Sequence, residues 1–140
     1  MTGAIIFASA TCLLQFAAFY FAHIRSFHVS VMVLLLIIDI CFPVYLFMTR
    51  DWYNQLIVQG DILTFGVWIH FMLVITLYVL YAVQVQVART IVARKENVER
   101  IIELKKEHRA QGLGILVTRP MMIFTGALLA PEIATTIVGA

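Results

Sequence analysis

VSVMVLLLIIDICFPVYLFMT, residues 29–49, is an almost unbroken run of apolar side chains with Asp39 near its middle. A helix that spans a membrane needs about 20 consecutive apolar residues, and this run has that length. A second run, FGVWIHFMLVITLYVLY at 65–81, contains His70 in the same way. The two runs predict helices that lie inside a bilayer, each with one ionisable side chain.

The composition of the whole chain agrees with this interpretation. Of the 140 residues, 62% are hydrophobic and 13% are charged, whereas apolar residues make up about half of a soluble domain. We therefore expect one transmembrane domain over residues 1–140. The formal net charge of +2 is small, and no basic patch is interleaved with aromatic residues, so we expect no nucleic-acid partner.

Apolar periodicity predicts an all-α fold, an integral membrane four-helix up-and-down bundle. The expected helices cover approximately 3–22, 29–49, 62–88 and 113–131. We expect the third helix to extend into the cytoplasm to about residue 108, with a turn at Gly112–Gly114 before the fourth. An alternative fourth span starts at Arg119-Pro120 and runs to residue 140.

The distribution of basic residues predicts the orientation. Seven of the ten Lys and Arg residues lie between Arg89 and Arg109, and Arg25 lies in the first connection. Short loops rich in Lys and Arg stay in the cytoplasm. The connections after the first and third helices should therefore be cytoplasmic, and both termini of this multi-pass protein should face outside.

Asp39 and His70 are functional candidates, because ionisable residues inside a span are costly. At 1.5 Å per helical residue, Asp39 lies about 15 Å below the outer boundary and His70 about 14 Å below it. We therefore predict that the two side chains are neighbours. Three roles remain open: a structural hydrogen bond, ligation of haem or a metal by His70 with Asp39 orienting it, and a proton relay.

A second set of candidates lies at the inner boundary. His28 is about 15 Å from the level of His70, so the two cannot share an iron. An inner metal or haem site would pair His108 with His28 or His23, and Arg109 and Arg119 would meet haem propionates. The alternative is that these polar residues bind lipid phosphate. Haem b is the first candidate cofactor, and copper, for which methionine is a soft ligand, is the second.

Three segments together resemble a known family: FHVSVM at 27–32, WIHFMLVITLYVLYAVQ at 68–84 and EHRAQGLGILVTRPMMIFTGALL at 107–129. They are similar to the CtaM/YozB-like family of small multi-helix membrane proteins. That family places a His at the start of one helix, a His inside the next, and a His-Arg pair before a last helix with Thr-Gly. The matching positions are His28, His70, His108-Arg109 and Thr125-Gly126. The resemblance implies a role in cytochrome oxidase maturation and a location in the bacterial inner (cytoplasmic) membrane.

Two functional hypotheses follow. The first is a haem- or metal-handling membrane protein that serves a larger membrane redox complex or oxidase, in maturation or electron transfer. The second is a non-catalytic accessory subunit that stabilises a larger membrane enzyme complex. We expect no independent catalytic activity, because no nucleophile or acid–base motif is visible. Lipid is an expected partner, and the Gly and Ala content of the first and fourth helices permits a homo-oligomer.

Overall fold

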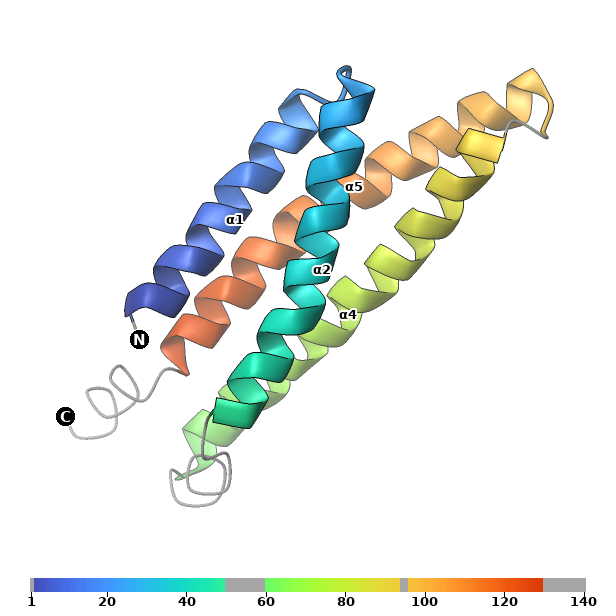
Figure 1. Ribbon diagram of the computed structural model, residues 1–140. Helices are drawn as coiled ribbons and strands as arrows, with labels where there is room; N and C mark the ends of the chain where they lie inside the picture. The colour runs from blue at the N-terminus through green and yellow to red at the C-terminus, as the bar shows by residue number, and fades with distance from the viewer. Residues whose placement is uncertain (1, 50–59, 94–95, 130–140) are drawn as a thin grey trace.

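The computed structural model describes residues 2–49, 60–93 and 96–129, which form four helices (Figure 1). These are α1 (Thr2–Tyr20), α2 (Arg25–Thr49), α4 (Gly60–Ala93) and α5 (Val98–Leu128). Successive helices run in opposite directions, so α2 and α5 are parallel (Figure 1). The prediction of an all-α protein with four helices is confirmed.

Three of the described helices are long and apolar enough to cross a membrane. The candidate spans are Gly3–Tyr20, Arg25–Thr49 and Phe65–Ala93. Most of their large apolar side chains are exposed on the outer surface, as lipid contact requires. The fourth helix, α5, is not among these candidates, and its first half has many charged residues.

The helices form two hairpins, α1–α2 and α4–α5. The most extensive packing joins α4 to α5, and α1 packs against both α2 and α5. Each hairpin has its own buried apolar cluster. The first cluster is Ala18, Val31 and Leu35, and the second is Leu77, Tyr81 and Ile115. Leu36 of α2 also packs against the second cluster, so apolar contacts as well as polar contacts join the two hairpins.

The predicted extension of the third helix to about residue 108 is wrong. α4 ends at Ala93, and α5 begins at Val98. Asn97 is the N-cap of α5, and its side chain accepts a hydrogen bond from the backbone N–H of Arg100 at 2.9 Å. Such a cap satisfies a donor that the first turn leaves free. Apolar periodicity continues on both sides of this break and therefore concealed it.

The predicted turn at Gly112–Gly114 is also wrong, because both glycines lie inside α5. A Cβ at Gly112 would lie 3.5 Å from Gln84 Nε2 and 3.5 Å from the Phe19 ring, and one at Gly114 would lie 3.6 Å from Leu80. Both glycines therefore face neighbouring helices at ordinary contact distances and do not interrupt α5. The predicted end of the fourth helix at residue 131 lies outside the described residues.

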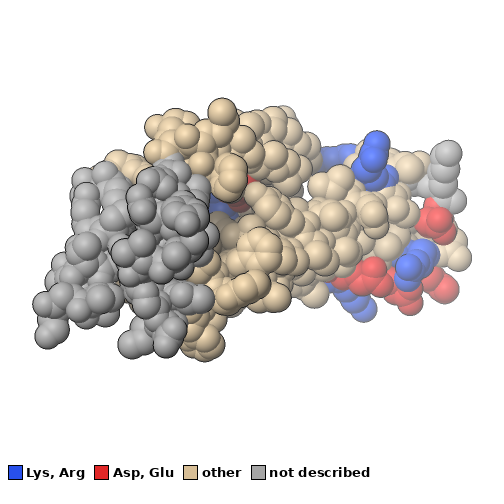
Figure 2. Space-filling model, turned by 90° about the horizontal axis from the view of Figure 1, so that it is seen from below, with Lys and Arg blue, Asp and Glu red and all other residues tan. Residues whose placement is uncertain are grey.

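Charged side chains gather at one end of the molecule (Figure 2). Most of them belong to the first part of α5, where Arg100 pairs with Glu103 at 3.0 Å and lies 3.7 Å from Glu107. These side chains are about half exposed. The end of the molecule that includes the α1–α2 turn and the start of α5 is called the polar end below.

Candidate functional site

Asp39 forms a buried ion pair with Arg119, from α2 to α5. Arg119 Nη2 donates to Asp39 Oδ1 at 2.6 Å, and the two side chains are 9% and 2% exposed. The same guanidinium reaches α1. Nη2 donates to Thr11 Oγ1 at 3.1 Å, while Nη1 donates to the Thr11 carbonyl at 2.9 Å and to Gln15 Oε1 at 3.4 Å. One arginine therefore joins three helices.

Two tyrosines of α4 complete the partners of Asp39. The Tyr81 hydroxyl donates to Asp39 Oδ2, and the Tyr78 hydroxyl donates to the Asp39 backbone carbonyl at 2.8 Å. This carbonyl is available because Pro43, four residues later in α2, has no N–H to donate to it. We call Asp39, Arg119, Thr11, Gln15, Tyr78 and Tyr81 the polar latch. It connects all four helices.

The predicted pairing of Asp39 with His70 is wrong. His70 instead contacts α5, with Nδ1 2.9 Å from Thr125 Oγ1. The Thr125 hydroxyl itself donates to the Met122 carbonyl, so Nδ1–H is the donor to Thr125. Gly126 makes room for the ring, because a Cβ there would lie 3.0 Å from His70 Cε1. The residues matched to Thr-Gly in the family resemblance thus form the contact surface of His70.

A difference in helix register explains the error. The prediction assumed that α2 ends and α4 begins at the same depth. Asp39 lies ten residues before Thr49, but its partner Tyr78 lies eighteen residues after Gly60. The difference of eight residues corresponds to about 12 Å along a helix. This offset places Tyr78, and not His70, opposite Asp39.

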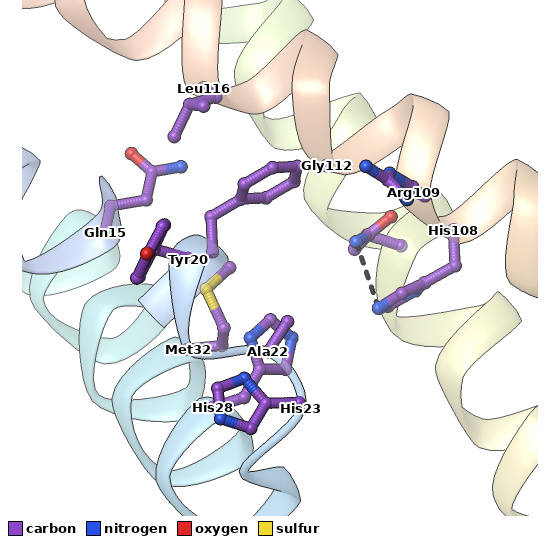
Figure 3. A pocket seen from close by; sticks show the side chains of 12 residues that line it. Gln15, Tyr20, Ala22, His23, His28, Met32, His108, Arg109, Gly112 and Leu116 are labelled. Atoms are coloured by element: carbon purple, nitrogen blue, oxygen red, sulfur yellow. Dashed lines mark hydrogen bonds between the residues drawn. The ribbon is translucent and has the colours of Figure 1, made fainter. Parts of the chain in front are cut away.

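A pocket of about 350 Å³ lies between the two hairpins at the polar end (Figure 3). Its lining combines imidazole, amide and basic groups with aromatic, thioether and aliphatic side chains. The lining residues are Gln15, Phe19, Tyr20, Ala22, His23, His28, Met32, Gln84, His108, Arg109, Gly112 and Leu116. Its volume is near the lower end of the range of about 300–1,000 Å³ that is typical of small-molecule sites.

The pocket brings together His28 of α2 and His108 of α5. The centres of their rings are 6.4 Å apart, and the ring planes make an angle of 73°. His28 Nδ1 lies 2.9 Å from the Ala18 carbonyl, to which it donates, so the neutral form of the ring has its lone pair on Nε2. His108 Nε2 lies 3.3 Å from Gln84 Nε2, and His108 Nδ1 is buried without a partner.

The surroundings of His108 in the pocket favour its neutral form. Burial, and in second place the charge of His28, lowers the pKa of His108 below its ordinary value. A neutral imidazole is the form that binds a metal.

Two pairs of residues with equal spacing connect the pocket to the polar latch. Asp39 follows His28 by eleven residues, and Arg119 follows His108 by eleven residues. Eleven residues make about three helical turns and a rise of about 16 Å. Because α2 and α5 are parallel, the ion pair and the histidine pair lie on the same two helix faces at two levels.

The structure therefore separates the predicted site residues into two groups. His28, His108 and Arg109 line the pocket, as does His23. Asp39, Arg119 and His70 do not line it, and Arg119 reaches it only through Gln15. Sequence analysis missed Gln15 and Gln84, because a single polar residue in an apolar helix has no motif around it. The shared eleven-residue spacing was the signal that could have identified both pairs.

Comparisons with protein-family models, with curated proteins and with solved structures find no match for the chain. Within residues 2–49, 60–93 and 96–129, no group of three or more His, Cys, Asp or Glu side chains is placed to hold a metal ion.

Proposed function

We propose that this protein handles haem at the polar end of the molecule, where His28 and His108 would hold the group. In this proposal it serves a larger membrane redox complex, in oxidase maturation or in electron transfer. The observation that supports it best is the pair of imidazoles, 6.4 Å apart, across a pocket between two hairpins. The family resemblance at His28 and His108 agrees with this role.

The residues present fit haem better than a bare metal ion. The ring centres of His28 and His108 are 6.4 Å apart, so both imidazoles are within reach of one group bound in the pocket. A copper or zinc ion would need further ligands, and the described residues provide no group of three. Haem iron already has four porphyrin nitrogens, so two histidines complete its coordination.

Each part of the pocket has a role in this proposal. The His28 ring is held by its Nδ1–H bond to the Ala18 carbonyl, which fixes the tautomer with the lone pair on Nε2. Phe19 and Leu116 would provide apolar walls, and Arg109 would provide a positive charge for haem carboxylates. When bound, haem supplies one-electron chemistry. The protein orients the ligands and controls the local polarity.

We also propose that the polar end is cytoplasmic and that both termini face outside, in a bacterial inner membrane. Three candidate spans and the charged first part of α5 support this arrangement. The second half of α5 would form the fourth span. Its single buried charge, Arg119, is neutralised by Asp39.

A haem titration tests the proposal. Purified protein in detergent is titrated with ferric haem b, and the Soret and α bands of the reduced and oxidised forms are recorded. We expect a low-spin spectrum of two axial histidines, which His28→Ala and His108→Ala each abolish while His70→Ala leaves it intact. The proposal fails if no Soret shift occurs, or if His70→Ala alone removes it.

The second candidate is an accessory subunit without a cofactor. The polar latch favours it, because Asp39, Arg119 and the two tyrosines all bond to one another or to other helices and leave no free reactive group on Asp39. In this case His28→Ala and His108→Ala would leave haem content of the partner complex unchanged, and Arg119→Leu would reduce assembly of that complex in membranes.

A further inference from the structure

The two histidines of the pocket are not equivalent. His28 has its Nδ1 anchored to a backbone carbonyl, so its Nε2 is free to bind a ligand. His108 has its Nε2 3.3 Å from the amide nitrogen of Gln84 on α4 (Figure 3). A neutral amide nitrogen only donates, so the His108 Nε2 lone pair accepts this hydrogen bond. The lone pair that would bind iron is therefore already engaged.

We propose that Gln84 acts as a placeholder: its amide N–H holds the His108 Nε2 lone pair in a hydrogen bond until haem binds. This competition makes haem binding reversible. This inference rests on the proposed haem site. Gln84 is 8% exposed, and its Oε1 is buried without a hydrogen-bond partner. Gly112 of α5 lies beside this amide, since a Cβ there would lie 3.5 Å from Gln84 Nε2, an ordinary contact distance. The amide is thus held beside His108 by the packing of α4 against α5.

The competition lowers the affinity for haem. When His108 Nε2 turns to iron, the amide N–H of Gln84 loses its acceptor inside the helix bundle. A typical hydrogen bond contributes enough to change an equilibrium by about 2- to 10-fold. A site that gives up its ligand readily suits a protein that passes haem on, whereas a storage or electron-transfer site has no need for such a competitor.

Substitution of Gln84 by leucine tests the inference, because leucine keeps the volume and removes the donor. Wild type and Gln84→Leu are titrated with ferric haem b, and the loaded proteins are mixed with excess apo-globin to measure the rate of haem release. We expect Gln84→Leu to bind about 2- to 10-fold more tightly and to release haem more slowly by a similar factor. The matched control is Gln86→Leu, an exposed glutamine on the same helix, which should behave as wild type.

A haem-free measurement separates this inference from the proposed function. Haem-free wild type and Gln84→Leu are both labelled with ¹⁵N-histidine, and their spectra are compared. The His108 Nε2 resonance should differ between the two proteins, while the His28 resonances should be the same. Gln84→Met gives the same test if the leucine variant does not fold. Equal or weaker haem binding by both variants overturns the placeholder role alone. Absence of haem binding by wild type and variants overturns both proposals, whatever the ¹⁵N shifts show.

Discussion

Removal of one partner of the Asp39–Arg119 pair should destabilise the protein strongly. The two side chains are 9% and 2% exposed, so neither Asp39→Leu nor Arg119→Leu lets water solvate the remaining charge. Loss of one partner of a buried ion pair costs about 3–5 kcal/mol. Replacement of both partners removes the stranded charge, and the main remaining cost is the Tyr81 hydroxyl without its acceptor, about 1–3 kcal/mol.

The double variant Asp39→Leu/Arg119→Leu should therefore be at least ~3 kcal/mol more stable than additivity of the single variants predicts. The measurement is the free energy of reversible unfolding in mixed detergent micelles, followed by far-UV circular dichroism. The control cycle uses Arg100→Leu and Glu103→Leu, an ion pair of 3.0 Å on the exposed part of α5, which should show almost no coupling. Additive effects at Asp39 and Arg119 would refute the reasoning.

Three further predictions concern single positions. Gly126→Ala should destabilise the protein by about 1–3 kcal/mol, because its Cβ would lie 3.0 Å from His70 Cε1; thermal unfolding measures this, and an unchanged melting temperature contradicts it. Gly112→Ala should instead raise stability by up to about 1 kcal/mol through helix propensity, since its new contacts of 3.5 Å are ordinary; a loss of stability would argue against a continuous α5. The third prediction is a pH dependence. The pKa of His108 is below 6.5 when folded, because burial and the charge of His28 disfavour protonation, so its contribution is complete above pH 6.5 and is lost as the pH falls below that value. Unfolding of the haem-free protein between pH 8 and 5 should show this loss, and His108→Gln should reduce it.

Hydropathy was sufficient to predict the all-α fold and three long apolar helices, because lipid exposure requires continuous apolar runs. It also predicted that His28 and His108 lie at the same end of the bundle, where both line the pocket. It could not identify the partner of Asp39. The depth estimate assumed that α2 ends and α4 begins at the same level. The contact between Asp39 and Tyr78 shows instead that the start of α4 is offset from the end of α2 by about 12 Å along the helix axis. Arg119, eighty residues from Asp39, has a partner only in the folded bundle.

Local signals for the missed features were nevertheless present in the chain. Pro43 lies four residues after Asp39, and this spacing leaves the Asp39 carbonyl free for an external donor, which is Tyr78. Asn97 followed by Glu99 is a helix start that an uninterrupted apolar pattern concealed. These features depend on one or two residues, whereas periodicity averages over a whole window.

The Asp39–Arg119 ion pair of the polar latch fixes the register of α5 against α2 and α1. A buried ion pair is no more stabilising than a well-packed apolar pair of similar volume, so stability gives little reason to keep Asp39 and Arg119. Apolar side chains, however, can slide past one another, while Arg119 reaches Asp39 and Thr11 in one register of α5 against α2 and α1. A shift of α5 by one residue would move it by about 1.5 Å and rotate it by about 100°. The same shift would turn His108, three turns above Arg119, away from His28. The ion pair therefore selects the register in which the two imidazoles face each other.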